Sequence, residues 1–346
     1  MPASNIKRAW IVVSVLVGVA ALCIGTYLYR QHRPLAGPDS GTAPAIMSLL
    51  PPGAPVVAYI DVAALRKLQG SPLAAMLGLV AADPKEDRDY QEFVRDTGFD
   101  YTRDLDTVAI AIWPEGLLTP NGGLAVNQAV AIANGRFDRE KIKAYALRIG
   151  QAESHGPQTF YSIPGDPPIV FGYNSPTQML LLSGKGMAIN TPLPRNESGD
   201  PTMQARIKRV AGAPIFAAAR TDTLPKSFYD NFKNAPQLEA LARTVTGLTL
   251  AGQPQGDRID MALDGECDSL THAAEVATFI DTLRLFATVA LSDPKMRRQM
   301  SKEQAAFLAA LVSQVKVTHQ DRWVRLTLTV TPEMLGPSDS NHADLR

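Results

Sequence analysis

The sequence predicts an α+β fold with mainly antiparallel sheets and packed helices, arranged as two related halves and preceded by one transmembrane helix. Three observations predict it. One stretch of 20 residues near the N-terminus carries no charge. Several short stretches alternate apolar and polar residues, which is the pattern of antiparallel strands with one face towards water. Helical stretches, with apolar residues spaced by three and four, lie between sets of these strands.

The uncharged stretch, residues 10–29, reads WIVVSVLVGVAALCIGTYLY. Its length suits a hydrocarbon core of roughly 30 Å. Trp10 opens it, and Tyr27 and Tyr29 close it, where aromatic side chains favour the membrane interface. We therefore expect an uncleaved signal anchor that holds the protein in the membrane.

The charges place the chain across this membrane. Residues 1–9 contain Lys7 and Arg8, so their translocation is disfavoured, and we expect a cytoplasmic tail with the bulk of the chain in the periplasm. Removing the four basic residues of residues 1–33 from the total of 34 leaves 30 against 34 acidic ones. An acidic domain without a basic stripe excludes nucleic acid as a partner.

Three other interpretations of the apolar stretch are weaker. A cleaved signal peptide has a shorter apolar core, and Ala43-Pro44-Ala45 lies too far downstream for its cleavage site. A lipoprotein signal ending at Cys23 needs a small residue where Leu22 stands. A buried core helix needs an earlier element to pack against.

Small residues follow one face of the expected membrane helix at spacings of 4, 3 and 4, namely Ser14, Gly18, Ala21 and Gly25. Small residues let two membrane helices approach closely, so this face predicts a homodimer. The alternative is that it reflects the common use of small residues in membrane helices.

The rest of the chain divides by composition. Residues 30–54 are rich in Pro, Gly, Ala and Ser and predict a semi-rigid linker. The first α+β half is expected at residues 55–195 and the second at residues 200–335. Residues 336–346 are polar and predict a flexible tail.

The two halves open with similar strands, PVVAYIDV from Pro55 and PIFAAART from Pro214. Later, each half has a strand, a glycine, an aspartate and then a helix, and the step between the two copies is 130 residues. The matched pairs are Gly135 with Gly265 and Asp138 with Asp268. A duplication explains both matches, and coincidence of two strand-turn-helix units is the alternative.

Alternation predicts further strands at residues 107–113, 160–163, 169–173, 178–183, 247–251, 259–263 and 323–330. Periodic apolar residues predict helices at residues 65–80, 85–97, 139–149, 201–210, 237–245, 269–291 and 301–315.

No catalytic, nucleotide-binding or metal-binding motif stands out, so we expect no cofactor and no metal site and assign no catalytic residue. The five histidines lie outside metal-ligand spacing of each other and of cysteine. Asp100, Asp104 and Asp106 gather in FDYTRDLD, and paired carboxylates can transfer protons. Arg103 in the same stretch favours a turn with an N-cap.

Two other features allow a functional and a structural interpretation. In the duplication, Cys267 takes the position of Phe137, whose contact with Ile142 would staple a helix start, so we expect a buried, inert thiol. His272 stands three residues before Glu275 and is expected on the surface. The apolar loop at residues 115–127 can bind a partner or fold back on its own core.

The pattern PPGAPVVAYIDVAALRKLQGSPL at residues 51–73, then FDYTRDLD, then residues 135–145, resembles uncharacterised bacterial envelope proteins with a single signal-anchor helix. The resemblance covers most of residues 50–335. It implies envelope placement and a duplicated α+β domain, and it carries no activity or functional residues.

The absence of an acid–base or nucleophile constellation favours a non-catalytic interaction or scaffolding protein of the cell envelope, with a protein partner. One alternative is a hydrolase whose site is assembled from Asp61, Asp222 and His155. Another is a periplasmic carrier of an apolar ligand. Convergence of the three polar residues would favour the hydrolase, and an apolar cavity of several hundred Å³ would favour the carrier.

Overall fold

The computed structural model describes residues 42–67, 88–116, 125–155, 158–165, 167–184, 200–223, 236–256, 258–292 and 302–331. The expected cytoplasmic tail, membrane helix, dimer face and C-terminal tail lie outside these residues, as does most of the apolar loop at residues 115–127. Of the helices within the described ranges, none combines the length and the apolar character needed to cross a membrane.

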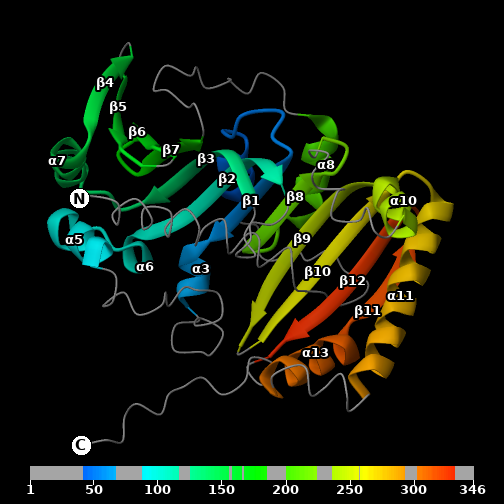
Figure 1. Ribbon diagram of the computed structural model, residues 1–346. Coiled ribbons are helices and arrows are strands. Elements are labelled where there is room, and N and C mark those ends of the chain that lie inside the picture. The colour runs from blue at the N-terminus through cyan, green and yellow to red at the C-terminus, as the bar shows by residue number, and fades with distance from the viewer. Residues whose placement is uncertain are drawn as a thin grey trace, which may run out of the picture.

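One antiparallel sheet joins the two halves (Figure 1), in the order β11-β12-β10-β9-β8-β1-β2-β3-β7-β6-β5-β4. This confirms the α+β class with antiparallel pairing, and it replaces the several sheets expected from the sequence with a single one. The strands are β1 (Val56–Asp61), β2 (Leu105–Gly116), β3 (Ala125–Gly135), β4 (Gln151–His155), β5 (Gln158–Ile163), β6 (Ile169–Ser175), β7 (Gln178–Gly184), β8 (Ile215–Arg220), β9 (Val245–Gln255), β10 (Arg258–Cys267), β11 (Lys316–Gln320) and β12 (Trp323–Val330).

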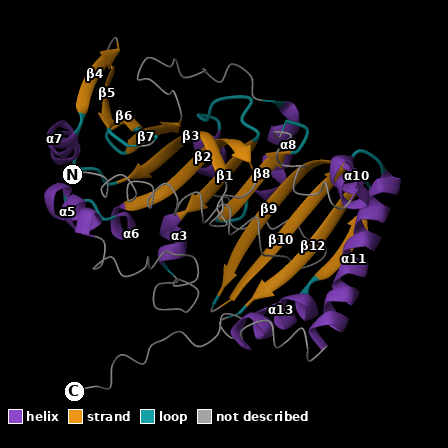
Figure 2. Ribbon diagram, in the orientation of Figure 1, coloured by secondary structure: helices purple, strands orange, loops and turns teal. Residues whose placement is uncertain are grey.

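Helices cover both faces of this sheet (Figure 2). One face carries most of them, and α2 and α8 lie on the other, as the two buried clusters of the central strands show. The helices of the first face are α3 (Val62–Arg66), α5 (Arg88–Thr97), α6 (Tyr101–Asp104), α7 (Arg139–Ile149), α10 (Pro236–Thr244), α11 (Leu270–Ser292) and α13 (Lys302–Gln314). Those of the second face are α2 (Thr42–Met47) and α8 (Pro201–Val210).

The two halves meet at the centre of the sheet, where β1 pairs with β8 and Ile60 lies opposite Ile215. From this pair outwards the first half runs β1-β2-β3-β7, and the second runs β8-β9-β10-β12. Each half therefore places its opening strand innermost, then its next two strands, then its last strand. The shared order is what a duplication would produce, and duplication itself stays a hypothesis.

The helix starts show that the match between the halves is shifted by one residue. Asp138 accepts the backbone N–H of Lys141 at 3.1 Å and caps α7. In the second half the backbone N–H of His272 donates to the hydroxyl of Ser269, also at 3.1 Å. The capping residues are thus 131 positions apart, one more than the step of 130 that matches Asp138 with Asp268 in the sequence. Ser and Asp both serve as N-caps, and the identical aspartates concealed the shift.

The central strands are apolar on both faces because both faces are covered. Along β1, Val56, Ala58 and Ile60 belong to the cluster under α3, whereas Val57 and Tyr59 belong to the cluster under α2 and α8. The ring of Tyr59 stacks on that of Phe216 in β8, with 5.1 Å between centroids. The opening strands of the two halves are therefore joined by side-chain packing as well as by backbone pairing.

Residues 42–54 are part of the folded core, so the linker predicted at residues 30–54 is wrong for this part of it, and residues 30–41 lie outside the described residues. Within this segment α2 and the turn after it bury five apolar residues that are at most 6 % exposed: Ala43, Ile46, Met47, Leu50 and Ala54. Their spacing over the first four, 3, 1 and 3, is that of one helical face. The surrounding Pro and Gly residues gave the segment the composition of a spacer and hid this pattern.

Strand β12 covers the predicted residues, but its polar face is not open to water as expected. Thr327 is only 4 % exposed, and the hydroxyl of Thr329 donates to Asp260 of β10 at 2.8 Å. Arg325 on the same face is ion-paired to Asp264. Alternation correctly separated the two faces, but it could not show that the polar one is covered.

Candidate functional site

The three polar residues of the hydrolase hypothesis do not converge. Asp61 ends β1, next to Pro214, and its carboxylate accepts the backbone N–H of Ala64 at 2.7 Å to cap α3. Asp222 lies two residues after Arg220, the last residue of β8. The backbone N–H of Arg220 donates to the carbonyl of Pro55, at the opposite end of β1 from Asp61. His155 ends β4, the outermost strand, six strands from β1. The structure therefore provides no common site for these side chains.

The carboxylates of the FDYTRDLD stretch serve local structure. Asp100 caps α6 by accepting the backbone N–H of Thr102 at 2.9 Å, which confirms the predicted turn and N-cap. Asp104 receives hydrogen bonds from Arg103 and Arg136 and from the backbone N–H of Asp100. The hydrogen bond from Arg103 lowers the pKa of Asp104 to about 2. A carboxylate so firmly ionised is a poor general acid or base at neutral pH.

Cys267 is completely buried, as predicted, and packs against Ala273 and Val324. Desolvation raises the pKa of its thiol to about 11, which disfavours the thiolate that reacts. Its predicted place in a hydrophobic staple is wrong, because Ser269 caps α11 and Asp268 precedes it. The burial of Cys267 comes from the end of β10 lying under α11.

His272 lies at the surface, as predicted, with its side chain 38 % exposed. Its ring is hydrogen-bonded to Asp268, and this bond raises the pKa of His272. Across the part of the chain that the structure describes, no three His, Cys, Asp or Glu side chains are grouped as a metal ion would require.

A buried set of ion pairs holds α8 to the polar face of the sheet. Arg206 donates to Glu266 at 2.9 Å and to the backbone carbonyl of Thr246 at 3.1 Å, and both charged side chains are less than 8 % exposed. One turn later, Arg209 reaches Asp264 at 3.2 Å. These contacts fix the orientation of α8 on β9 and β10.

Each of the two acids in this set has a second arginine. Arg325 binds Asp264 through two hydrogen bonds of 2.6 Å, and Arg322 binds Glu266 at 2.9 Å. Arg209 also lies over the ring of Trp323, 3.9 Å from its centroid. With both carboxylates paired twice, this cluster is suited to fixing α8 rather than to transferring a proton.

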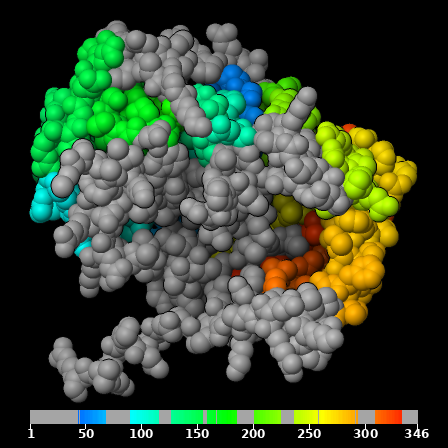
Figure 3. All heavy atoms as spheres, viewed as in Figure 1, coloured from blue at the N-terminus to red at the C-terminus, as the bar shows by residue number. Residues whose placement is uncertain are grey.

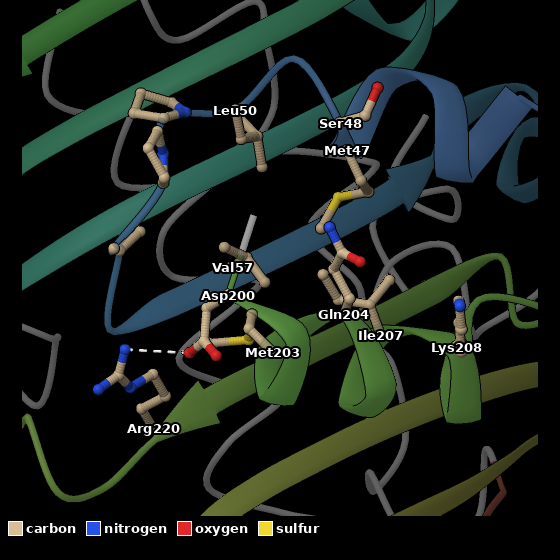
Figure 4. Close-up of a pocket in the computed structure, with 14 residues that line it drawn as sticks. Met47, Ser48, Leu50, Val57, Asp200, Met203, Gln204, Ile207, Lys208 and Arg220 are labelled. Atoms are coloured by element: carbon tan, nitrogen blue, oxygen red, sulfur yellow. Dashed lines mark hydrogen bonds and ion pairs between the residues drawn. The ribbon is translucent and has the colours of Figure 1, made fainter. Parts of the chain in front are cut away.

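A pocket that the sequence did not indicate lies between α2 and α8 (Figure 4). It encloses about 190 Å³ and is mostly apolar. Val57 of β1 forms its floor, and the turn after α2 closes one end. The apolar lining residues are Met47, Leu50, Pro51, Pro52, Ala54, Val57, Met203 and Ile207. Its wall from α2 belongs to the segment predicted as linker, which explains why the pocket was missed.

Charged and polar groups line the rim. Asp200 caps α8 by accepting the backbone N–H of Thr202 at 2.9 Å and pairs with Arg220 at 3.0 Å. A hydrogen bond to Asp222 raises the pKa of Arg220. Gln204 and Lys208 stand on the exposed side of α8 along the same rim, and Figure 4 shows both beside Ile207.

This arrangement can bind a ligand. The described lining contains no histidine and no cysteine, the hydroxyl of Ser48 donates to the backbone carbonyl of Ala45 at 2.8 Å, and the acid Asp200 is engaged with Arg220. An apolar cavity of about 150 Å³ accommodates benzene, whereas pockets for drug-sized ligands are about 300–1,000 Å³. The pocket therefore suits one aromatic ring or one branched aliphatic side chain.

Helix α11 lies at the surface of the molecule (Figure 3), and several of its apolar side chains are exposed there. Leu283, Leu285, Phe286 and Val289 are between 47 % and 70 % exposed. The hydroxyl of Thr288, on the same segment, donates to the helix backbone and adds little polarity. This feature is a ridge rather than a cavity, so the pocket between α2 and α8 is the better-defined site.

The sequence matches no protein-family model and no curated protein. No family model therefore supports the resemblance to envelope proteins that the sequence shows. In overall fold the chain is similar to solved structures of TP0453. Crystal form III has a TM-score of 0.45 and 9 % identity over 84 % of this chain and 95 % of that one. Crystal form I has a TM-score of 0.44 and 11 % identity over 84 % and 94 %. At these TM-scores and identities, the similarity concerns the arrangement of the backbone and says nothing about activity.

Proposed function

We propose that this protein is a membrane-anchored interaction protein of the cell envelope, which binds a protein partner and catalyses no reaction. In this proposal residues 10–29 are the anchor, and the described domain lies on the periplasmic side. The observation that carries the binding role is the small apolar pocket between α2 and α8, with charged groups on its rim.

The placement of the charged residues supports a non-catalytic role. Asp61 and Asp100 cap helices, Asp104 is bound by two arginines, and Glu266 and Asp264 clamp α8. Each of these carboxylates thus has a structural task that accounts for its position. The residues of the hydrolase hypothesis lie on different strands and at opposite strand ends, which speaks against that alternative.

The size of the pocket speaks against the carrier alternative. A carrier must enclose most of its ligand, and pockets that do so usually exceed about 300 Å³. The pocket here, at about 190 Å³, is smaller. It is better suited to a single side chain that remains attached to a larger partner, as in the central pockets of protein interfaces.

The position of α2 keeps the pocket near the expected membrane. Thr42 begins α2 only 13 residues after Tyr29, the end of the predicted anchor. Even a fully extended chain of that length spans at most about 45 Å. Since α2 forms one wall, the pocket would face partners in the same membrane or in the layer next to it.

The anchoring is tested with the full chain carrying a C-terminal tag. We expect the tag to sediment with membranes, to resist alkaline extraction and to be digested by protease added to spheroplasts. The double substitution Leu16→Arg with Val17→Arg places two charges in the centre of the segment. It should release the chain from the membrane fraction because each charge is costly there. A mature chain beginning near Leu22, Cys23 or Ile46, or a tag that protease reaches only after lysis, would contradict the proposal.

The interaction is tested by photocrosslinking in intact cells. A photoreactive residue replacing Gln204, on the pocket rim, should give a discrete adduct whose partner is identified by mass spectrometry. The same residue replacing Lys143 of α7, whose side chain is 45 % exposed, is the matched control and should not give that adduct. If native mass spectrometry instead finds the purified chain loaded with an apolar small molecule, the carrier alternative is correct and the interaction proposal fails.

A further inference from the structure

We infer that the pocket between α2 and α8 receives one large apolar side chain of a partner polypeptide, and that an acidic residue beside this side chain pairs with Lys208. This inference rests on the proposed function and names the chemistry that the partner must present. Three properties of the pocket carry it: the material of its walls, its volume and the charge on its rim.

The walls are apolar and adaptable. Met47 from α2 and Met203 from α8 line the pocket together with Ile207 (Figure 4). Methionine side chains are unbranched and polarisable, so they adjust to apolar guests and make favourable contacts with aromatic rings. The floor at Val57 is fixed, because β1 is paired on both sides. A rigid floor with two adjustable walls suits an inserted phenylalanine or leucine side chain.

The volume distinguishes a side chain from a lipid chain. A space near 150 Å³ is sufficient for benzene, and this pocket has about 190 Å³. The pocket would therefore enclose one ring or one branched aliphatic group and little more. A membrane lipid acyl chain is several times longer than such a group, so most of it would remain outside. The size thus favours an anchor residue of a polypeptide over a lipid tail.

The rim supplies a cation that is available to the partner. The lining contains two basic residues, Lys208 and Arg220, and one acid, Asp200. Arg220 is shared between Asp200 and Asp222, whereas Lys208 is exposed and has no ion-pair partner in the described part of the chain. A carboxylate placed beside the inserted side chain would therefore meet an unpaired positive charge at Lys208.

The test uses the full chain in phosphatidylcholine nanodiscs, with ¹³C-labelled methionine methyl groups. The Met47 and Met203 signals are assigned by replacing each residue with leucine. Three peptides serve as probes: acetyl-GEFEG-amide, acetyl-GKFKG-amide and acetyl-GEAEG-amide. The acidic phenylalanine peptide should shift both signals to saturation. The lysine peptide should bind about fivefold more weakly, the scale of one exposed ion pair, and the alanine peptide should leave both signals unmoved.

Variants separate the contributions of charge and cavity. Lys208→Glu should reverse the preference between the acidic and the lysine peptide. Lys143→Glu on α7 is the matched control and should leave the preference unchanged. Ile207→Phe should fill the pocket from within and abolish binding, while the remaining methionine signals report that the chain is still folded. Higher salt should reduce the difference between the two peptides because exposed charges are screened.

Several results would overturn the inference. Equal binding of the acidic and lysine peptides, wild-type binding by Ile207→Phe, or unmoved Met47 and Met203 signals would each do so. Broadening of these two signals by a spin-labelled acyl chain, without peptide, would identify a lipid site instead. These failures are distinct from failure of the proposed function, because a crosslinked partner at Gln204 would still establish an interaction protein that recognises its partner in another way.

Discussion

The guanidinium group of Arg206 lies directly over the backbone of Gly247, in the space that any side chain at position 247 would occupy. From there Arg206 reaches Glu266 of β10 and the carbonyl of Thr246. Because Gly247 of β9 has no side chain, Arg206 of α8 can pass over it and form an ion pair with Glu266 of the sheet. Because α8 forms one wall of the pocket, this contact also fixes the geometry of the candidate site.

Gly247→Ala should displace Arg206 and weaken the buried ion pair, at a cost of about 2–4 kcal/mol in the free energy of unfolding. Urea unfolding of the variant measures this cost. Gly265→Ala, on the adjacent strand, is the matched control. A Cβ atom there meets nothing closer than 3.8 Å, so its effect should stay within about 1 kcal/mol. Equal effects of the two substitutions would show that Arg206 moves aside without penalty.

Residues 42–54 should contribute to stability as core rather than as linker. Ile46 is 2 % exposed and packs in the cluster under α2 and α8, so Ile46→Ala should cost about 2–4 kcal/mol. Leu49, three residues later, is 49 % exposed, and Leu49→Ala should cost less than about 1 kcal/mol. Both values come from chemical denaturation of the full chain. A negligible effect at Ile46 would restore the linker interpretation of this segment.

Asp104 should make the domain sensitive to acid. Its pKa in the folded protein is about 2, against 3.8 for the unperturbed group, mainly because of the hydrogen bond from Arg103. A lowered pKa stabilises the fold above the unfolded value, and this contribution is lost as the pH falls through the folded value. Between pH 4.5 and pH 2, the stability difference between wild type and Asp104→Asn should therefore shrink by up to about 2 kcal/mol.

The control for this acid effect is Asp106→Asn. Asp106 is 40 % exposed in its side chain, and its arginine partners lie 3.7 and 3.9 Å away, so it makes looser contacts than Asp104. Its substitution should leave the acid-dependent loss of stability nearly unchanged. An acid dependence that survives in Asp104→Asn would assign the effect to other carboxylates.

Cys267 should be unreactive in the folded protein. In a Cys23→Ser background it is the remaining thiol, and its burial and raised pKa should slow labelling by a thiol reagent on the order of 100-fold relative to the urea-unfolded chain. Cys267→Ala should cost on the order of 1–2 kcal/mol through lost packing. Rapid labelling under native conditions would show that the end of β10 opens readily.

Much of the secondary structure was predictable because it depends on local pattern. The helix at Pro201–Val210 and the strand at Trp323–Val330 match their predicted ranges. In the first, proline follows a capping aspartate, and in the second, apolar and polar residues alternate strictly. The strands Gln151–His155 and Lys316–Gln320 were missed because edge strands with little burial carry no clear alternation.

The candidate site was not predictable from the sequence. Met47 and Met203 are 156 positions apart, and they come together only because α2 and α8 pack side by side over β1 and β8. The first of these segments had the composition of a spacer. The three polar residues chosen as a possible catalytic set, Asp61, Asp222 and His155, were separated by the same sheet.

By itself, the sequence determined the α+β class, the antiparallel pairing and most strands and helices, because these follow from local periodicity and hydrophobicity. The tertiary structure alone decided that β1 and β8 join both halves in one sheet and that residues 42–54 belong to its core. It also decided that the side chain of Arg206 lies over Gly247 and forms an ion pair with Glu266. Each of these depends on contacts between residues far apart in the chain, which no local pattern encodes.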